Sequence, residues 1–186
     1  MEPKTIVTML DETEDRRGVI QSISKNAQPS DLFQALQLAS NPQPKQILIR
    51  MIADLGSEEN WSVLSPFLRD KDHRVRGAAA DGIARLEAHD AAGAITAALI
   101  AENDGSVLAQ LSAAAGAVGA SSAVSALLDL VINGDVATRR AAAWSLAEIA
   151  DSSSHSVLLE AVAAEHDSTV LASLKRALAR TAPAGE

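Results

Sequence analysis

The sequence predicts an all-α protein, an α-α superhelix (a solenoid) of about six antiparallel helix pairs, and two observations support this fold class. First, aspartates at positions 72, 104, 135 and 167 are 32, 31 and 32 residues apart, and each is followed by a helical pattern of apolar residues. Second, 47% of the residues are hydrophobic but only 2% are aromatic, so the core must consist of small and aliphatic side chains. Helices rich in alanine can approach one another closely, which favours helix-on-helix packing.

The second helix of each repeat is recognised by apolar residues that follow the aspartate and lie on one face of the helix. In the clearest copy, Asp135 can accept hydrogen bonds from the first turn of a helix that ends near Ala150. Side chains at spacings of three and four then lie on one side of that helix and predict its buried face. The predicted faces are Thr138, Ala142, Leu146 and Ile149; Val75, Ala79, Ile83 and Leu86; Val107, Leu111, Ala115 and Val118; and Val170, Leu174 and Leu178.

The chain, 1–186, is predicted to be a single domain made of a terminal pair and five repeats. Residues 1–27 should form a polar capping pair, because the outer face of a terminal unit has no neighbour to bury it. The next repeat, 29–56, starts at a proline and ends at Gly56, where a left-handed C-cap costs least. The further repeats are 57–88, 89–120, 121–152 and 153–181, and a disordered tail is expected at 182–186.

The first helices of the repeats also align with one another. Both helices of each pair are amphipathic, so each pair should be stable mainly because it stacks on its neighbours. In the fifth pair, Asn133 and Gly134 are expected to form the tight turn between the helices. Two aligned columns are predicted, one of Val63, Ile95, Ala126 and Leu158 and one of Phe67, Leu99, Leu130 and Val162.

Charge and composition exclude several classes of function. Sixteen basic and 24 acidic residues give a formal net charge of −8, which opposes binding to nucleic acid. The chain has no cysteine, so it has no disulfide, thiol nucleophile or cysteine-ligated metal. No apolar run reaches the length of a membrane span, and the first residues lack a secretory pattern. We therefore expect a cytoplasmic protein that does not contact membranes.

The repeat resembles a known family. Its two best copies are Asp72-His73-Arg74-Val75-Arg76-Gly77-Ala78-Ala79 and Asp135-Val136-Ala137-Thr138-Arg139-Arg140-Ala141-Ala142. This phrase, at the start of the second helix of a pair of about 31 residues, is similar to the HEAT-like repeat of phycobilin lyases over roughly residues 30–180. Leu108 and Leu171 depart from it, since the pattern has arginine there, and Asn41 and Pro44 replace the aspartate and the valine. The resemblance implies a HEAT-like solenoid whose second helices line a concave binding surface.

Most of the residues that could carry chemistry have a structural interpretation. The repeated aspartates, with Arg76 and Arg139, should cap the second helices and tie adjacent turns together, each contributing on the order of 1 kcal/mol. Gly116 and Gly119 fit close helix packing better than a phosphate-binding loop. The histidines fall in turns or at helix ends, none precedes a glutamate, and they should be exposed and unliganded. They are His73, His89, His155 and His166. No catalytic residue, metal site or resident cofactor is predicted.

The predicted binding surface lies on the outward positions of the second helices. Two adjacent rows can be aligned there: Arg50, Asp81, Ala113, Trp144 and Arg176; and Asp54, Arg85, Ala117, Glu148 and Arg180. Trp144 is the unusual member of its row. It is either an exposed anchor for a partner or a side chain turned into a groove left by Ala113 and Ala117. Trp61, on a first helix, is expected to be partly buried.

Two hypotheses of function follow. In the first, the chain is a non-catalytic scaffold or adaptor that binds a protein partner, as a monomer or as a heterodimer with another repeat protein. Its partner-binding residues are Trp144, Arg50, Asp81, Arg85, Arg140, Glu148 and Arg176. In the second, implied by the resemblance, it is a bilin lyase subunit or a chaperone of phycobiliproteins that acts with a second HEAT-like chain. The cofactor would then be an open-chain tetrapyrrole, with its propionates on Arg85, Arg140 or Arg176 and its rings stacked on Trp144. DNA binding, as in HEAT-like glycosylases, is disfavoured by the net charge.

Overall fold

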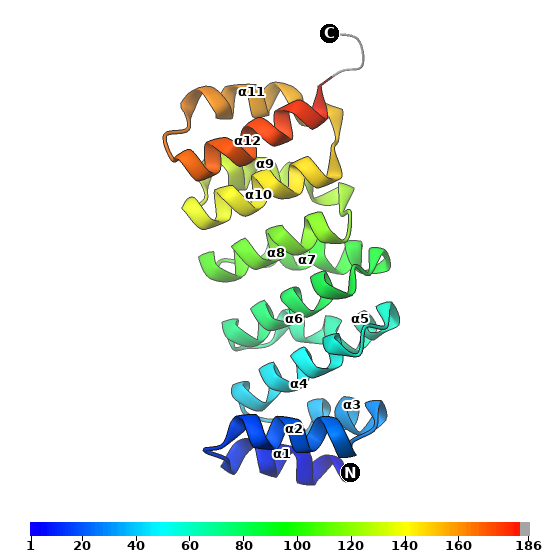
Figure 1. The fold of residues 1–186 in the computed structure, drawn as a ribbon. Coiled ribbons are helices and arrows are strands. Elements are labelled where there is room, and N and C mark those ends of the chain that lie inside the picture. The colour runs from blue at the N-terminus through cyan, green and yellow to red at the C-terminus, as the bar shows by residue number, and fades with distance from the viewer. Residues whose placement is uncertain (183–186) are drawn as a thin grey trace. The chain divides into compact units, whose positions relative to one another are not determined.

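The computed structural model describes residues 1–182, and all regular structure in that range is helical (Figure 1). The prediction of an all-α repeat fold is confirmed. The chain forms two compact units, unit 1 up to Leu86 and unit 2 from Glu87 onward. The predicted tail at 182–186 falls outside the described residues except for the exposed Ala182. None of the helices within residues 1–182 is long and apolar enough to cross a membrane.

Unit 1 contains three helix pairs. The terminal pair buries little, with Ile6 and Leu10 on its first helix and Ile23 on its second, in agreement with a polar cap. The first helix of the third pair becomes a 3-10 helix after four residues, because Pro66 lacks the N–H that a regular α-helix would use. The helices are α1 (Pro3–Glu12), α2 (Arg16–Asn26), α3 (Pro29–Leu38), α4 (Pro42–Asp54), α5 (Trp61–Leu64) and α6 (His73–Leu86), with short 3-10 helices at Glu58–Asn60 and Ser65–Arg69.

Unit 2 contains three further pairs, in which α8, α10 and α12 lie side by side (Figure 1). Each first helix is preceded by a 3-10 turn. The elements are η3 (His89–Ala91), α7 (Ala92–Ala101), α8 (Gly105–Ala117), η4 (Ser121–Ala123), α9 (Val124–Asn133), α10 (Val136–Ile149), η5 (Ser152–Ser154), α11 (His155–Ala164) and α12 (Ser168–Thr181).

The predicted buried faces of the second helices are correct in α6 and α8, where all four positions are buried. In α10 the first three are buried, whereas Ile149 is only half-buried next to Ala150, whose left-handed backbone ends the helix. In α12 Leu178 is half-buried, and Ala177 is the buried residue of that turn. The period therefore located the core, except at the last predicted position of α10 and of α12.

The columns predicted for the first helices were wrong by one residue in two repeats. Leu64 and Leu127 are fully buried, whereas Val63 and Ala126 are only half-buried. The reason is that the first helices do not recur at the same spacing as the aspartates that start the second helices. The first helices α7 and α9 begin at positions 92 and 124, which is 32 residues apart, but the aspartates that follow them, at 104 and 135, are 31 apart.

That one-residue difference lies in the turn after α9, where Gly134 is the single residue between the end of the helix and Asp135. A Cβ atom at Gly134 would lie 2.6 Å from the carbonyl oxygen of Leu130 and 2.9 Å from Cγ2 of Thr138. Only glycine fits such a short connection. The predicted tight turn is confirmed, and so is Gly56, whose φ of 73° is left-handed.

The aspartates cap the second helices, as predicted. Asp104 accepts hydrogen bonds from the backbone N–H groups of Ser106 and Val107, and Asp167 from those of Thr169 and Val170. The N–H of Thr138 donates to Asp135 over 2.7 Å, and this hydrogen bond holds the pKa of that carboxyl below its ordinary value. Each cap satisfies donors that no residue inside the helix can satisfy.

Candidate functional site

The second helices of each unit place the predicted binding residues on their outward sides. In unit 1, Arg50 on α4 and Asp81 and Arg85 on α6 are exposed. In unit 2, Arg140 on α10 and Arg176 on α12 are exposed, whereas Trp144 and Glu148 on α10 are half-buried. We call these outward sides the second-helix surface of each unit.

On the second-helix surface of unit 1, an ion pair joins two neighbouring members of one predicted row. The guanidinium of Arg85 on α6 contacts the carboxylate of Asp54 on α4, and the two side chains are 53% and 50% exposed. Because water screens such a pair, it stabilises the fold by at most about 1 kcal/mol. The pair therefore orients two charged side chains without removing them from the surface.

The second-helix surface of unit 2 is predominantly basic. Glu148 on α10 lies 2.5 Å from a guanidinium nitrogen of Arg176 and 3.7 Å from one of Arg180, both on α12. One carboxylate thus faces two cations. Arg140 adds a third exposed cation on α10, two turns before Glu148. A chain with a net charge of −8 therefore concentrates positive charge on this surface.

Trp144 is turned toward α8 and does not stand free. Its Cζ3 atom lies 2.8 Å from the place that a Cβ atom of Gly116 would occupy. Of the two predicted states of Trp144, the one turned toward a neighbouring helix is therefore observed, and Gly116, which was not among the predicted lining residues, makes room for the indole. A partner could still contact the part of the indole that is exposed.

Gly116 also allows α8 and α10 to approach closely, which confirms its predicted role. A Cβ atom there would lie 2.8 Å from the Cα atom of Ser145. At this crossing the buried Ser145 hydroxyl donates a hydrogen bond of 2.5 Å to the carbonyl oxygen of Ser112. The tryptophan is thus held by the same contact that sets the spacing of the two helices.

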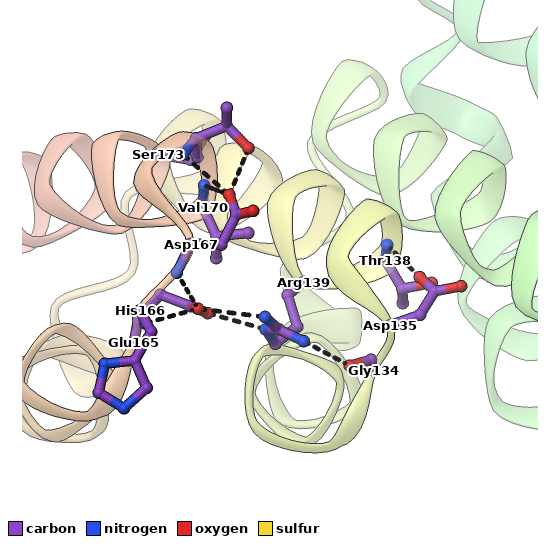
Figure 2. A network of polar contacts seen from close by, with 10 residues as sticks. Gly134, Asp135, Thr138, Arg139, Glu165, His166, Asp167, Val170 and Ser173 are labelled. Atoms are coloured by element: carbon purple, nitrogen blue, oxygen red, sulfur yellow. Dashed lines mark hydrogen bonds and ion pairs between the residues drawn. The ribbon is translucent and has the colours of Figure 1, made fainter.

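A second group of charges ties adjacent turns together (Figure 2). Arg139 on α10 forms two hydrogen bonds to Glu165, of 2.7 and 3.1 Å, and its third nitrogen donates to the carbonyl oxygen of Gly134 over 3.1 Å. Glu165 also accepts from the N–H groups of His166 and Asp167. The hydrogen bonds from Arg139 are the main reason that the pKa of Glu165 is lowered to about 2.

Sequence reasoning predicted that Arg139 would tie turns together but did not identify its acidic partner. Glu165 stands two residues before the repeated aspartate. Unit 1 has the same arrangement, in which Lys45 on α4 contacts Asp70, two residues before Asp72, over 2.5 Å. A signal was present in the sequence, because acidic residues recur two places before the aspartates at 72, 104 and 167.

The histidines differ in part from the prediction. His73, His89 and His166 are exposed as expected, but His155 is half-buried with its Nδ1 atom 3.3 Å from the Thr181 hydroxyl. His155 therefore bridges the two helices of the last pair. Trp61 is half-buried, as expected. In the part of the chain that the structure describes, no three histidine or acidic side chains gather in a way that could hold a metal ion.

The model of the HEAT repeats matches the chain twice, over residues 29–115 and 94–179. The chain belongs to the HEAT repeat family. A designed armadillo repeat protein is similar at a TM-score of 0.62 and 16% identity, with 97% of this HEAT repeat chain and 93% of the other covered. An engineered protein reaches a TM-score of 0.56 at 19% identity, with 96% of this chain and 57% of that chain covered.

The complex of CpcE and CpcF of phycocyanin lyase from Nostoc sp. PCC7120 gives a lower TM-score of 0.41, at 14% identity over 98% of this chain and 95% of that chain. At these identities the likenesses to the designed armadillo repeat protein and to the engineered protein show the fold alone. No curated protein matches the chain.

Proposed function

We propose that this HEAT repeat chain is a non-catalytic scaffold that binds a protein partner on the second-helix surface of unit 2. The observation that carries this proposal is the set of exposed arginines on α10 and α12. Arg176 and Arg180 contact a single carboxylate, Glu148, and Arg140 is a further exposed cation on α10, in a chain that is acidic as a whole. An acidic surface on the partner would complement this charge.

The proposed surface rests on a rigid support. α10 buries Ala142, Leu146 and Ala147 completely, so its backbone cannot shift without opening the core. Arg176 and Arg180 are oriented by their contacts with Glu148. Preorganised cations lose less side-chain entropy when a partner binds, which favours recognition. The indole of Trp144, held against α8, offers an aromatic contact at the edge of this charged group.

The first experiment is to purify the chain from its native source at moderate salt, identify the retained protein by mass spectrometry, and measure its affinity with purified components. We expect the double variant Arg140→Glu and Arg176→Glu to bind about tenfold more weakly or worse, which corresponds to about 1.4 kcal/mol. The matched control is the double variant Arg17→Glu and Arg69→Glu, which makes the same two charge reversals at exposed residues of unit 1. Equal affinity of both variants would refute the proposed surface.

The proposal also covers the compartment and the oligomeric state in which the chain acts. We place the scaffold in the cytoplasm, as a monomer or as a heterodimer with a second repeat protein. Sedimentation velocity of the purified chain, alone and with the retained partner, measures the stoichiometry. A homodimer that buries α10 and α12 would contradict it.

A second candidate function is the binding of an open-chain tetrapyrrole. It is proposed because the repeated sequence is similar to that of phycobilin lyases. Arg140 and Arg176 are exposed and could pair with the two propionates, and Trp144 could stack on a ring. Titration with biliverdin should then shift its visible absorbance, and Arg140→Ala should weaken the shift. An unchanged spectrum, with and without a phycobiliprotein subunit, would exclude this function.

A further inference from the structure

A groove of about 390 Å³ in unit 2 lies away from the second-helix surface, between the first helices α7 and α9 and the start of α8. Its floor is apolar and consists of Leu99, Ile100, Leu108 and Leu130. Ile100 is 69% exposed and is the most exposed large hydrophobic side chain within residues 1–182. Glu102 and Asp129 are the charged residues that line it.

The same place in the next repeat is lined by an arginine of the chain itself. A groove of about 330 Å³ there is lined by Val131 and Ile132, which occupy the places of Leu99 and Ile100, and by Arg139 with its partner Glu165. Arg139 is the fourth residue after the capping Asp135, and Leu108 is the fourth after Asp104. The repeat therefore normally supplies a cation at this position, and leucine replaces it at 108.

Neither member of the ion pair between Arg139 and Glu165 has a counterpart around Leu108. The loop after α9 has Gly134 before its aspartate, without the acid that Glu165 provides in the next loop. The exposed Asp129 carboxylate remains on the rim, and within residues 1–182 no hydrogen bond or ion pair joins it to another group. The groove thus presents an aliphatic floor and carboxylates, and no basic residue of the described chain lines it.

We propose that this groove binds a partner segment that contains an arginine flanked by aliphatic residues. The methylene stem of the arginine and a neighbouring leucine lie on Ile100 and Leu108. The guanidinium pairs with Asp129, because its planar fork matches a carboxylate. The partner thus supplies a cation to a groove of the kind that Arg139 lines within the chain one repeat further on, with Asp129 as its acid in place of a loop carboxylate. This site is separate from the second-helix surface, and it can be correct whether or not the scaffold proposal holds.

The test uses the full chain, labelled with ¹⁵N, and a blocked peptide of sequence Gly-Leu-Arg-Leu-Gly as the probe. We expect saturable shifts of the backbone amides around Ile100, Leu108 and Asp129, and none there with the matched peptide in which glutamate replaces arginine. Leu108→Arg, which restores the residue type found at Arg139, should weaken binding at least tenfold. The matched control, Leu171→Arg, makes the same change at the equivalent position of α12, outside the groove.

The proposal is overturned if the peptide shifts no amide of the groove at millimolar concentration, if the glutamate peptide shifts the same amides, or if Leu108→Arg binds as the wild type does. Should Leu108→Arg fail to fold, Asp129→Asn decides in its place, because Asp129 is exposed and its loss leaves the core intact. Binding to the Asp129→Asn variant with unchanged affinity would also refute the site.

Discussion

At the scale of single residues, small side chains decide where the large ones can go. Trp144 could not be placed from its row alone, because the residue that admits it, Gly116, lies on another helix and outside both predicted rows. The indole and the backbone of Ser145 meet at that glycine. Helical spacing reports which side a residue faces, but not which atoms it meets across a crossing.

Gly116→Ala tests this contact. Alanine improves helix propensity by up to about 1 kcal/mol, but its Cβ atom would meet Ser145 and Trp144 at distances of 2.6 to 2.8 Å. One of these atoms is the Cα atom of Ser145, which cannot move by itself, so the strain should outweigh the gain and destabilise the protein by about 1–3 kcal/mol. The urea midpoint, followed by circular dichroism, measures the change.

Gly93→Ala is the matched control, because a Cβ atom there has no neighbour within 4 Å. Gly93 lies in the first turn of α7, and its replacement by alanine should be neutral or slightly stabilising. Equal effects of the two substitutions would show that helix propensity, and not the contact with α10, governs Gly116.

The bonded pair of Arg139 and Glu165 predicts a dependence of stability on pH. The folded pKa of Glu165 is about 2, below its ordinary value of 4.5. A lowered folded pKa stabilises the protein above the unfolded pKa, and this stability is lost as the pH falls from about 4.5 toward 2. Glu165→Gln should therefore lower the free energy of unfolding at neutral pH by on the order of 1 kcal/mol, measured from the urea midpoint, and lose less stability than the wild type on acidification.

The control for the pH experiment is Glu160→Gln, because Glu160 is exposed on the helix that precedes the same loop. This substitution should leave both the midpoint and its pH dependence close to those of the wild type. If Glu165→Gln and wild type lose stability in parallel between pH 5 and pH 2, the pair contributes nothing measurable.

At the scale of elements, the sequence predicted the existence of every helix pair but not the register of the first helices. The aspartate caps act on backbone donors nearby in sequence, so their period marks the start of the second helix reliably. The first helices are joined to the caps by turns of different length, and Gly134 removes one residue from one turn. Counting backwards from the aspartate therefore gave Ala126 where Leu127 is buried.

Asp167→Ala tests the value of one cap. Asp167 accepts hydrogen bonds from the N–H groups of Thr169 and Val170 and from the Thr169 hydroxyl. Its loss should lower the stability of α12 and increase amide hydrogen exchange in the first turn of that helix. His166→Ala, at the exposed neighbouring position, should change neither. Uniform exchange changes throughout unit 2 would instead indicate that the cap acts on the whole unit.

At the scale of the whole molecule, the fold and the charge balance have separate consequences. The family model and the helical repeat establish what kind of protein this is, and the period of the aspartates was enough to predict it. The proposed partner surface depends on details that the period does not contain, such as the contacts of Glu148 with two arginines of another helix. Sequence reasoning gave the members of that surface, and only the structure shows which of them are already paired.

The net charge gives a last expectation, that the chain does not bind duplex DNA despite the arginines on α10 and α12. With 24 acidic and 16 basic residues, the long-range field repels phosphates, and Glu148 offsets part of the local positive charge. A labelled duplex of about 20 base pairs should show no change in anisotropy with micromolar protein at about 50 mM salt, where phosphate contacts are strongest. Binding that weakens steeply as salt is raised would show that the arginines of unit 2 override the net charge, and Arg140→Glu would then have to abolish it.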